Sequence, residues 1–541
     1  MDRKSQFRFL TRHFFDRLFD KDSASANSDP RGNLYPTLGL LASAGLTLGF
    51  LGALSPNFVV FYSMIVTGFV MVSKWNFLFP DKRDYLILGS LPILYRDLFS
   101  AKVAALCLYP GLFTVSANTF VTLMAPLGKN GTIWQNLSAH LAGTFGGSLF
   151  MALGFAALQG VLISVLPERT FRRISPVVQM VSMALLLMVL LAFPIISAGL
   201  GWLEEHGTKA IEGFPFFWFL GVYLLPEDGP DRMFHGFALN ALYGLIVAGG
   251  ISVTTYAIAY RSHARSVLDA MDFYPSGDDP WRLRLTRRMD RLLLRNPVQR
   301  ACFRFIGSIL SRSTRHQVFL AVYLAVGLAL GLTSLLSIRP RALFPFEIAP
   351  DGMLGLPLTL SFFVVSGLRA TFNIPVELEG NWIFQLTEAP DSEGYVAATR
   401  KWVAVYGIAP LMLLAATLEF AYWPWRAAVF HLAFESIVSL LLLQLLFFTF
   451  RKVPFTCSAY PGRRNVVILG AIYLFGFTTY RSNMVALEGW AAQSPSWALL
   501  FFVQGIATLI ALSSLRRRQN STRLIYEEQS EMEILGLGLN K

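Results

Sequence analysis

Residues 428–450 read AVFHLAFESIVSLLLLQLLFFTF, an apolar stretch with one acidic residue and no lysine or arginine. At about 1.5 Å per residue, a helix over this stretch is long enough to cross the roughly 30 Å hydrocarbon core of a bilayer. Similar blocks recur along the whole chain, which soluble domains do not show. The pattern predicts an all-α polytopic membrane protein.

The composition agrees with this fold class. The 541 residues are 54% hydrophobic and 15% charged, with a mean hydropathy of +0.50; soluble proteins usually carry about 25% charged residues. We predict about twelve transmembrane helices, as two pseudo-repeats of six with amphipathic cytoplasmic helices. The expected spans are 35–54, 57–74, 102–127, 139–166, 176–199, 234–260, 316–337, 354–374, 401–423, 428–450, 465–481 and 495–515.

The basic residues orient these spans. Of the 46 lysines and arginines, 39 fall in alternate connecting segments and the two ends, and seven fall on the other face. Cytoplasmic loops retain lysine and arginine, so the sequence predicts that both termini are cytoplasmic. The same rule explains the net charge of +12 without nucleic acid as a partner.

Several common site patterns are missing from the sequence. Three cysteines lie far apart, and there is no HExxH, no GxSxG and no GxxxxGK[ST]. We therefore expect no metal site, no catalytic residue and no bound cofactor in this chain. No cleavable signal precedes the first apolar block, so we expect that span to be retained.

The expected organisation has five parts: an N-terminal interfacial helix and tail (1–34), a first six-span half (35–260), a basic cytoplasmic linker with an interfacial helix (261–315), a second six-span half (316–515) and a cytoplasmic tail (516–541). Short repeats support the two halves. His140-Leu-Ala and His431-Leu-Ala both open a fourth span, and a serine follows each histidine eight residues later, at Ser148 and Ser439.

The connection after the second span of each half is long and partly apolar. It covers 75–102 in the first half and 372–401 in the second, and each copy places an acid four residues after a proline and has a second proline further on. Such a segment is too polar to cross the bilayer and too apolar to lie free in water. We predict a short amphipathic helix at the cytoplasmic surface, contacting a partner or only lipid.

The first copy, with Pro-Asp-Lys-Arg-Asp at 80–84, Leu-Pro at 91–92 and Phe-Ser-Ala-Lys at 99–102, resembles the coupling segment of ABC-2-type transporter permeases. The resemblance implies a fused two-repeat permease, an exporter in a bacterial inner membrane. Separate ABC ATPase subunits would bind ATP and Mg and dock on these segments. The substrate is not indicated, and the second copy is more acidic and has Ala389-Pro390 instead of Leu-Pro. The residues expected to couple to the ATPase are Asp81, Arg83, Asp84, Leu91, Pro92, Tyr95, Arg96, Glu379, Trp382, Phe384 and Pro390.

A second candidate site is an intramembrane polar cluster of Glu419, His431 and Glu435, near the outer ends of the ninth and tenth spans. Ionisable groups inside a membrane are rare and often functional. We favour an interhelical charge and hydrogen-bond cluster near the lipid headgroups; a role in pairing protons or cations with transport is the other interpretation. Thr144 stands where the second half has Glu435.

The alternative function is a secondary active transporter of the major facilitator type, which also has six plus six spans and a long central loop. That family has a short loop rich in glycine and arginine between spans two and three. The long amphipathic segment 75–102 does not match it. A membrane enzyme has less support, because no clustered metal ligands or nucleophile pattern occurs.

Overall fold

A computed structural model gives the fold of the chain. It describes residues 3–19, 38–45, 56–78, 93, 95–124, 132–191, 193, 213–227, 233–269, 294, 296–338, 346–376, 381–386, 393–457, 466–519 and 524. These residues fall into two compact units, one within 1–275 and one within 276–541, apart from a short stretch assigned to the first unit at 340–345. Each unit is described by itself.

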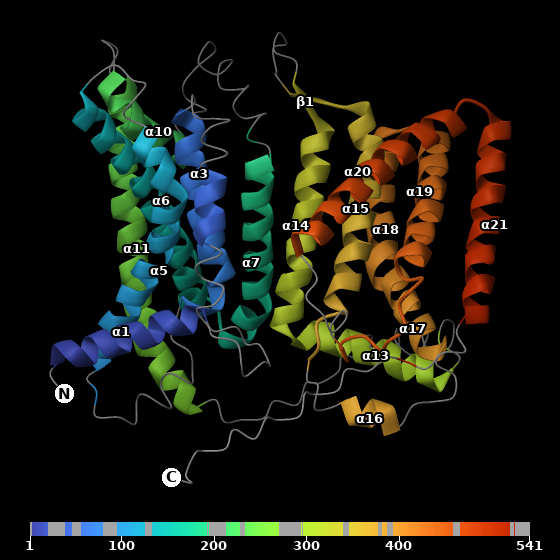
Figure 1. The fold of residues 1–541 in the computed structure, drawn as a ribbon, viewed down its shortest axis with the longest axis horizontal. Helices are drawn as coiled ribbons and strands as arrows, with labels where there is room; N and C mark the ends of the chain where they lie inside the picture. The colour runs from blue at the N-terminus through green and yellow to red at the C-terminus, as the bar shows by residue number, and fades with distance from the viewer. Residues whose placement is uncertain are drawn as a thin grey trace, which may run out of the picture. The chain divides into compact units, whose positions relative to one another are not determined.

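The first unit is helical throughout its described part (Figure 1). Its elements are α1 (Arg3–Phe19), α3 (Pro56–Ser73), a 3-10 turn (Trp75–Phe77), α5 (Tyr95–Met124), α6 (Ile133–Val165), α7 (Glu168–Leu191), α10 (Pro215–Leu224), a second 3-10 turn (Leu225–Glu227) and α11 (Met233–Asp269). The aromatic run that begins at Phe214 forms α10, which packs on α3, α6 and α11. Its residue Phe219 is almost fully buried.

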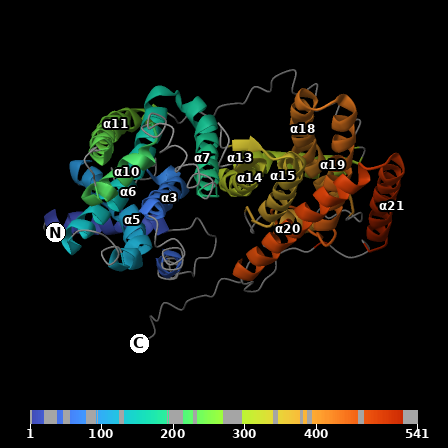
Figure 2. The same ribbon diagram turned by 90° about the horizontal axis from the view of Figure 1, so that it is seen from above.

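The second unit is built around a different set of helices. They are α13 (Pro297–Arg312), α14 (Thr314–Leu335), α15 (Pro350–Thr371), α16 (Asn381–Leu386), α17 (Glu393–Val403), a π-helical turn (Ala404–Ile408), α18 (Ala409–Tyr422), α19 (Trp425–Leu446), α20 (Val466–Ala491) and α21 (Pro495–Gln519). Figure 2 shows α20 running obliquely past α15 and α19.

A small β-hairpin interrupts this helical unit. The strands β1 (Leu336–Ile338) and β2 (Phe346–Ile348) pair antiparallel, with Ser337 opposite Glu347. These two short strands differ from the predicted all-α fold. The pairing lets the backbone after α14 satisfy its polar groups before Pro350 starts α15.

Two amphipathic helices pack across the ends of other helices, one in each unit. In the first unit, Leu10 and Phe14 of α1 pack against Leu98 and Ala101 of α5. In the second, α13 starts where the Asn296 side chain accepts a hydrogen bond from the backbone N–H of Val298, and it packs on α17. Figure 1 shows α1 and α13 lying across the direction of the long helices.

Nine helices among the described residues are long and apolar enough to cross a membrane. The predicted multi-pass membrane protein is therefore supported, whereas the count of twelve and the pseudo-repeats stay predictions. Helix α3 falls in a shorter class of apolar helix, and the span expected at 35–54 lies largely outside the described residues. The span expected at 465–481 was placed too short: α20 continues to Ala491, because no proline occurs before Pro495.

Candidate functional site

The predicted polar cluster lies where two helices of the second unit meet at a tight turn. Helix α18 ends at Tyr422 because Pro424 follows two residues later, and Trp423 has the extended backbone expected before a proline. Pro424 then starts α19, so the chain reverses at once. This reversal places Glu419, three residues from the end of α18, beside His431, six residues into α19.

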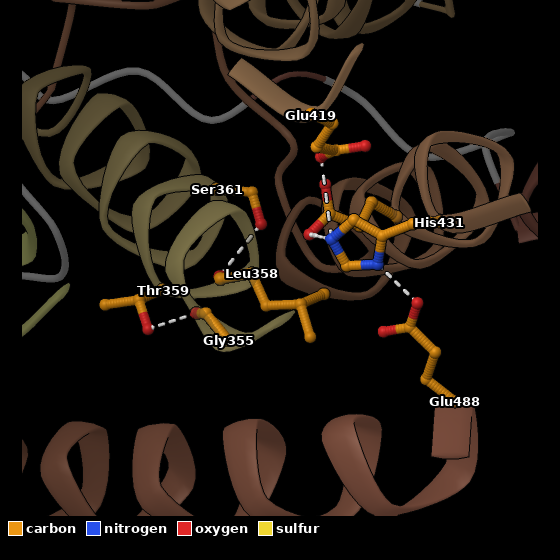
Figure 3. Close-up of polar contacts among 8 residues, drawn as sticks. Gly355, Leu358, Thr359, Ser361, Glu419, His431 and Glu488 are labelled. Carbon is orange, nitrogen blue, oxygen red and sulfur yellow. Dashed lines mark hydrogen bonds and ion pairs between the residues drawn. The ribbon is translucent and has the colours of Figure 1, made fainter. Parts of the chain in front are cut away.

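The imidazole of His431 is the centre of the cluster (Figure 3). Its Nε2 atom lies 3.0 Å from an oxygen of Glu435 and 3.5 Å from an oxygen of Glu419. Glu435 follows His431 by one helical turn on α19, so both side chains point from the same face. The side chains of Glu419, His431 and Glu435 are all buried, and Trp423 packs edge-on against the imidazole at 5.1 Å.

A fourth residue completes the cluster and was not predicted. Glu488 of α20 makes a hydrogen bond and ion-pair contact with Nδ1 of His431, on the other side of the ring from Glu435. It is 3% exposed. The sequence analysis missed it because it ended that span at 481. One signal in the sequence could have identified Glu488. It is an acidic residue in a proline-free stretch that continues from the predicted span to Pro495.

The cluster carries more negative than positive charge. Three carboxylates surround one imidazole, and among the described residues no lysine or arginine lies within ion-pair distance of any of them. Glu419 and Glu488 also sit in the last turns of α18 and α20, where the helix dipole adds further negative potential. Such an arrangement favours a bound cation or protonated carboxyl groups.

Several polar atoms of the cluster have no well-directed hydrogen bond. Within the described part of the chain, neither oxygen of Glu419 or Glu435 receives one, and Nε2 of His431 makes close contacts rather than a hydrogen bond of good geometry. Buried carboxylate oxygens normally have partners. One of these oxygens from each of Glu419 and Glu435 lies beside Nε2.

The sequence indicated no metal site, because no ligands stand at metal-binding spacing along the chain. The fold nevertheless places one ligand atom each from Glu419, His431 and Glu435 within 4.8 Å of one another. Glu419 and His431 come together only through the turn at Pro424. The expectation of no metal site stays a prediction, but these three residues could hold an ion.

A pocket leads from outside to the cluster. Its volume is about 520 Å³, and His431 and Glu488 contribute to its lining together with Trp423, Arg426 and Phe430. Arg426 is exposed. The pocket gives a small solute a route to the imidazole edge that faces Glu488.

The other predicted site, the coupling segments, is described only in part. Asp81, Arg83, Asp84, Leu91, Pro92, Glu379 and Pro390 lie outside the described residues. Tyr95 and Arg96 begin α5, and Trp382 and Phe384 lie on α16. The structure does not bring these residues near the His431 cluster in any described contact.

Helix α16 contacts the rest of the unit through Asn381 and Phe384 and exposes other side chains. The buried Asn381 side chain donates a hydrogen bond of 2.6 Å to the backbone oxygen of Thr456, and Phe384 packs edge-on against Phe305 of α13 at 5.3 Å. In contrast, Trp382 is 61% exposed and Leu386 is 78% exposed.

The positions that match the cluster in the first unit carry only neutral groups. On α6, His140 contacts the hydroxyl of Thr122 at 3.0 Å, and Thr144 and Ser148 follow at the spacing of Glu435 and Ser439. Ser148 lies 2.8 Å from Ser63 in a buried hydroxyl network. Both helices thus bury a histidine, and on α19 the described contacts of that histidine are to carboxylates.

Comparison of the chain with protein-family models, with curated proteins and with solved structures finds no match.

Proposed function

We propose that this chain is the membrane-spanning permease subunit of an ATP-driven transporter of the ABC-2 type, most consistent with an exporter in a bacterial inner membrane. ATP and Mg would bind to separate ATPase subunits, and this chain would not itself be an enzyme. The observation that carries the proposal is α16, which lies in the second predicted coupling segment and exposes large apolar side chains.

The exposed face of α16 consists of Trp382, Ile383 and Leu386, which are 61%, 49% and 78% exposed. Asn381 and Phe384 fix the helix to the rest of the unit, so this face is presented on an anchored element. Exposed apolar side chains gathered on a fixed helix are typical of a surface that another molecule covers.

The charge around α16 favours a protein over lipid as that molecule. Between Arg369 and Arg400 the sequence has no lysine or arginine, but it has five acidic residues. These are Glu377, Glu379, Glu388, Asp391 and Glu393. The cytoplasmic leaflet is negatively charged and attracts basic segments, so an acidic segment gains little from lying on it. A basic groove on an ATPase subunit fits both the apolar face and the acids.

The test is purification of the tagged chain from membranes of its native host, followed by measurement of ATP hydrolysis in the eluate. Wild-type protein is expected to retain an ATPase subunit, and Trp382→Ser with Leu386→Ser to lose most of it. The matched control is Trp134→Ser, because Trp134 of α6 is 79% exposed but lies outside the coupling segments. Equal retention of ATPase by all three proteins, or none with wild type, contradicts the proposal.

A secondary active transporter is the second candidate, and the buried His431 cluster is the observation that favours it. Titratable groups buried between helices are typical of ion-coupled transport. Transport by vesicles that stops with a protonophore and continues without ATP would support this candidate. Transport that requires ATP and resists the protonophore supports the ATP-driven permease.

A further inference from the structure

We propose that Glu419, His431 and Glu435 bind a divalent transition-metal cation, with Glu488 orienting the histidine. This site is independent of the ATPase-docking proposal, because it involves other residues and other helices of the second unit. A cation that accepts nitrogen and oxygen ligands, such as Zn²⁺, fits the ligand set.

The distances between the ligand atoms fit a tetrahedral ion. Zinc binds imidazole nitrogen and carboxylate oxygen at about 2.0–2.2 Å, which separates neighbouring ligands in a tetrahedron by roughly 3.4 Å. In the cluster, Nε2 of His431 lies 3.0 Å from Glu435 and 3.5 Å from Glu419. All three ligand atoms lie within 4.8 Å of one another, so one ion can contact them after the side chains adjust.

Glu488 supplies a second feature of metal sites. A metal-binding histidine usually donates its other ring N–H to a carboxylate, which fixes the tautomer and the ring orientation. Glu488 contacts Nδ1 of His431, and this contact leaves Nε2 as the nitrogen that faces Glu435 and Glu419. The four residues thus form a ligand set with an orienting partner.

The polar atoms that the fold leaves without partners support a cation at this place. Both oxygens of Glu419 and of Glu435 lack hydrogen bonds among the described residues, and the two side chains are at least nine-tenths buried. Three buried carboxylates beside one imidazole are costly unless a positive charge compensates them. A divalent cation satisfies the free oxygens and the charge together.

The pocket reaches the Glu488 side of His431, past Trp423 and the exposed Arg426. Glu419 and Glu435 are not among its lining residues. Three protein ligands at the Nε2 side leave one position of a tetrahedral ion for water.

The first unit offers a matched control within the same chain. His140 is as buried as His431 and occupies the corresponding place on α6. It contacts the hydroxyl of Thr122. Because His140 lies on a different helix from the three proposed ligands, its replacement is not expected to change zinc binding at them.

The experiment uses the full chain in lipid nanodiscs, carrying a tag without histidines. The protein is loaded with Zn²⁺, dialysed, and assayed for bound metal by elemental mass spectrometry. Wild type and His140→Gln are expected to keep about one zinc per chain. His431→Gln and Glu435→Gln are expected to bind at least tenfold more weakly. Glu488→Gln is expected to bind about 10- to 100-fold more weakly, as for other orienting partners.

Helical content and elution volume show whether each variant is folded. If His431→Gln and Glu435→Gln do not fold, X-ray absorption by zinc bound to the wild type tests the proposed ligands instead. Nitrogen and oxygen neighbours at about 2.0–2.2 Å are the expected result. Wild type that keeps no zinc, zinc bound through sulfur, or equal loss of zinc in His140→Gln overturns the proposal.

Discussion

At the scale of single residues, the charge of the His431 cluster predicts how Glu419→Gln changes stability. The effect is expected to have opposite signs without metal and with Zn²⁺. Without metal, Glu419→Gln removes one of three buried carboxylates that repel one another, so we expect the variant to be more stable by about 1 kcal/mol. With Zn²⁺ present, the same change removes a ligand, so the stabilisation by zinc is expected to fall. Thermal unfolding in detergent, with a chelator and then with zinc, measures both effects.

The control for this prediction is Asp16→Asn on α1. Asp16 is 34% exposed and lies 3.8 Å from Arg12, which is 70% exposed; such surface pairs contribute about 0–1 kcal/mol. Its removal should change the unfolding temperature little, with or without zinc. A Glu419→Gln variant that is destabilised in the chelator would show that the carboxylates are already compensated without metal.

At the scale of helices, α14 and α15 pack closely through paired contacts between glycine and aromatic residues. A Cβ added at Gly327 would lie 2.7 Å from Cβ of Phe363, and one added at Gly367 would lie 2.7 Å from Cβ of Tyr323. The two pairs are reciprocal, since each helix contributes one glycine and one aromatic residue. Packing between small residues is a common basis of helix association in membranes.

We therefore expect Gly327→Ala and Gly367→Ala each to destabilise the second unit by about 1–3 kcal/mol, because the helices must move apart. The control is Gly476→Ala on α20, where an added Cβ has no atom within 4 Å; this change should be neutral or slightly stabilising. Unfolding in a denaturing detergent series compares the three variants. If Gly327→Ala and Gly476→Ala had the same stability, the close packing of α14 on α15 would be contradicted.

The bounds of some helices could be predicted from the sequence, and those of others could not. Apolar length alone placed both ends of α14 and α19 within four residues, whereas α6 begins six residues before the predicted span. It did not place the end of α20, where Arg481 suggested a boundary although nothing breaks the helix. Glu435 lies ten residues into the 22-residue helix α19, and its place near the outer end of a span stays a prediction.

The candidate site was predicted only in its local part. Glu435 and His431 are one turn apart, so their contact follows from helix geometry. Glu488 lies 57 residues from His431 in the chain, and its approach depends on how α20 packs against α19. Such a contact between distant residues cannot be obtained from spacing in one sequence.

At the scale of the whole molecule, the 39 to 7 division of basic residues predicts which side each segment faces. Leu386 of α16 should face the cytoplasm, and Ile133 at the start of α6 should face the opposite side. Both side chains are exposed, at 78% and 62%. In a chain with Cys107, Cys302 and Cys457 replaced by alanine, Ile133→Cys should react with an impermeant maleimide on intact cells. Leu386→Cys should react only after the membrane is opened, and the reverse pattern would contradict the orientation.

Photo-crosslinking from position 386 in native membranes is the most direct test of the proposed function. A photoreactive amino acid at 386 is expected to form a crosslink to a separate polypeptide that contains a phosphate-binding loop, identified by mass spectrometry. The same amino acid at position 134 should form no such product. Crosslinks from 386 to lipid alone would contradict the proposal that an ATPase subunit docks on α16.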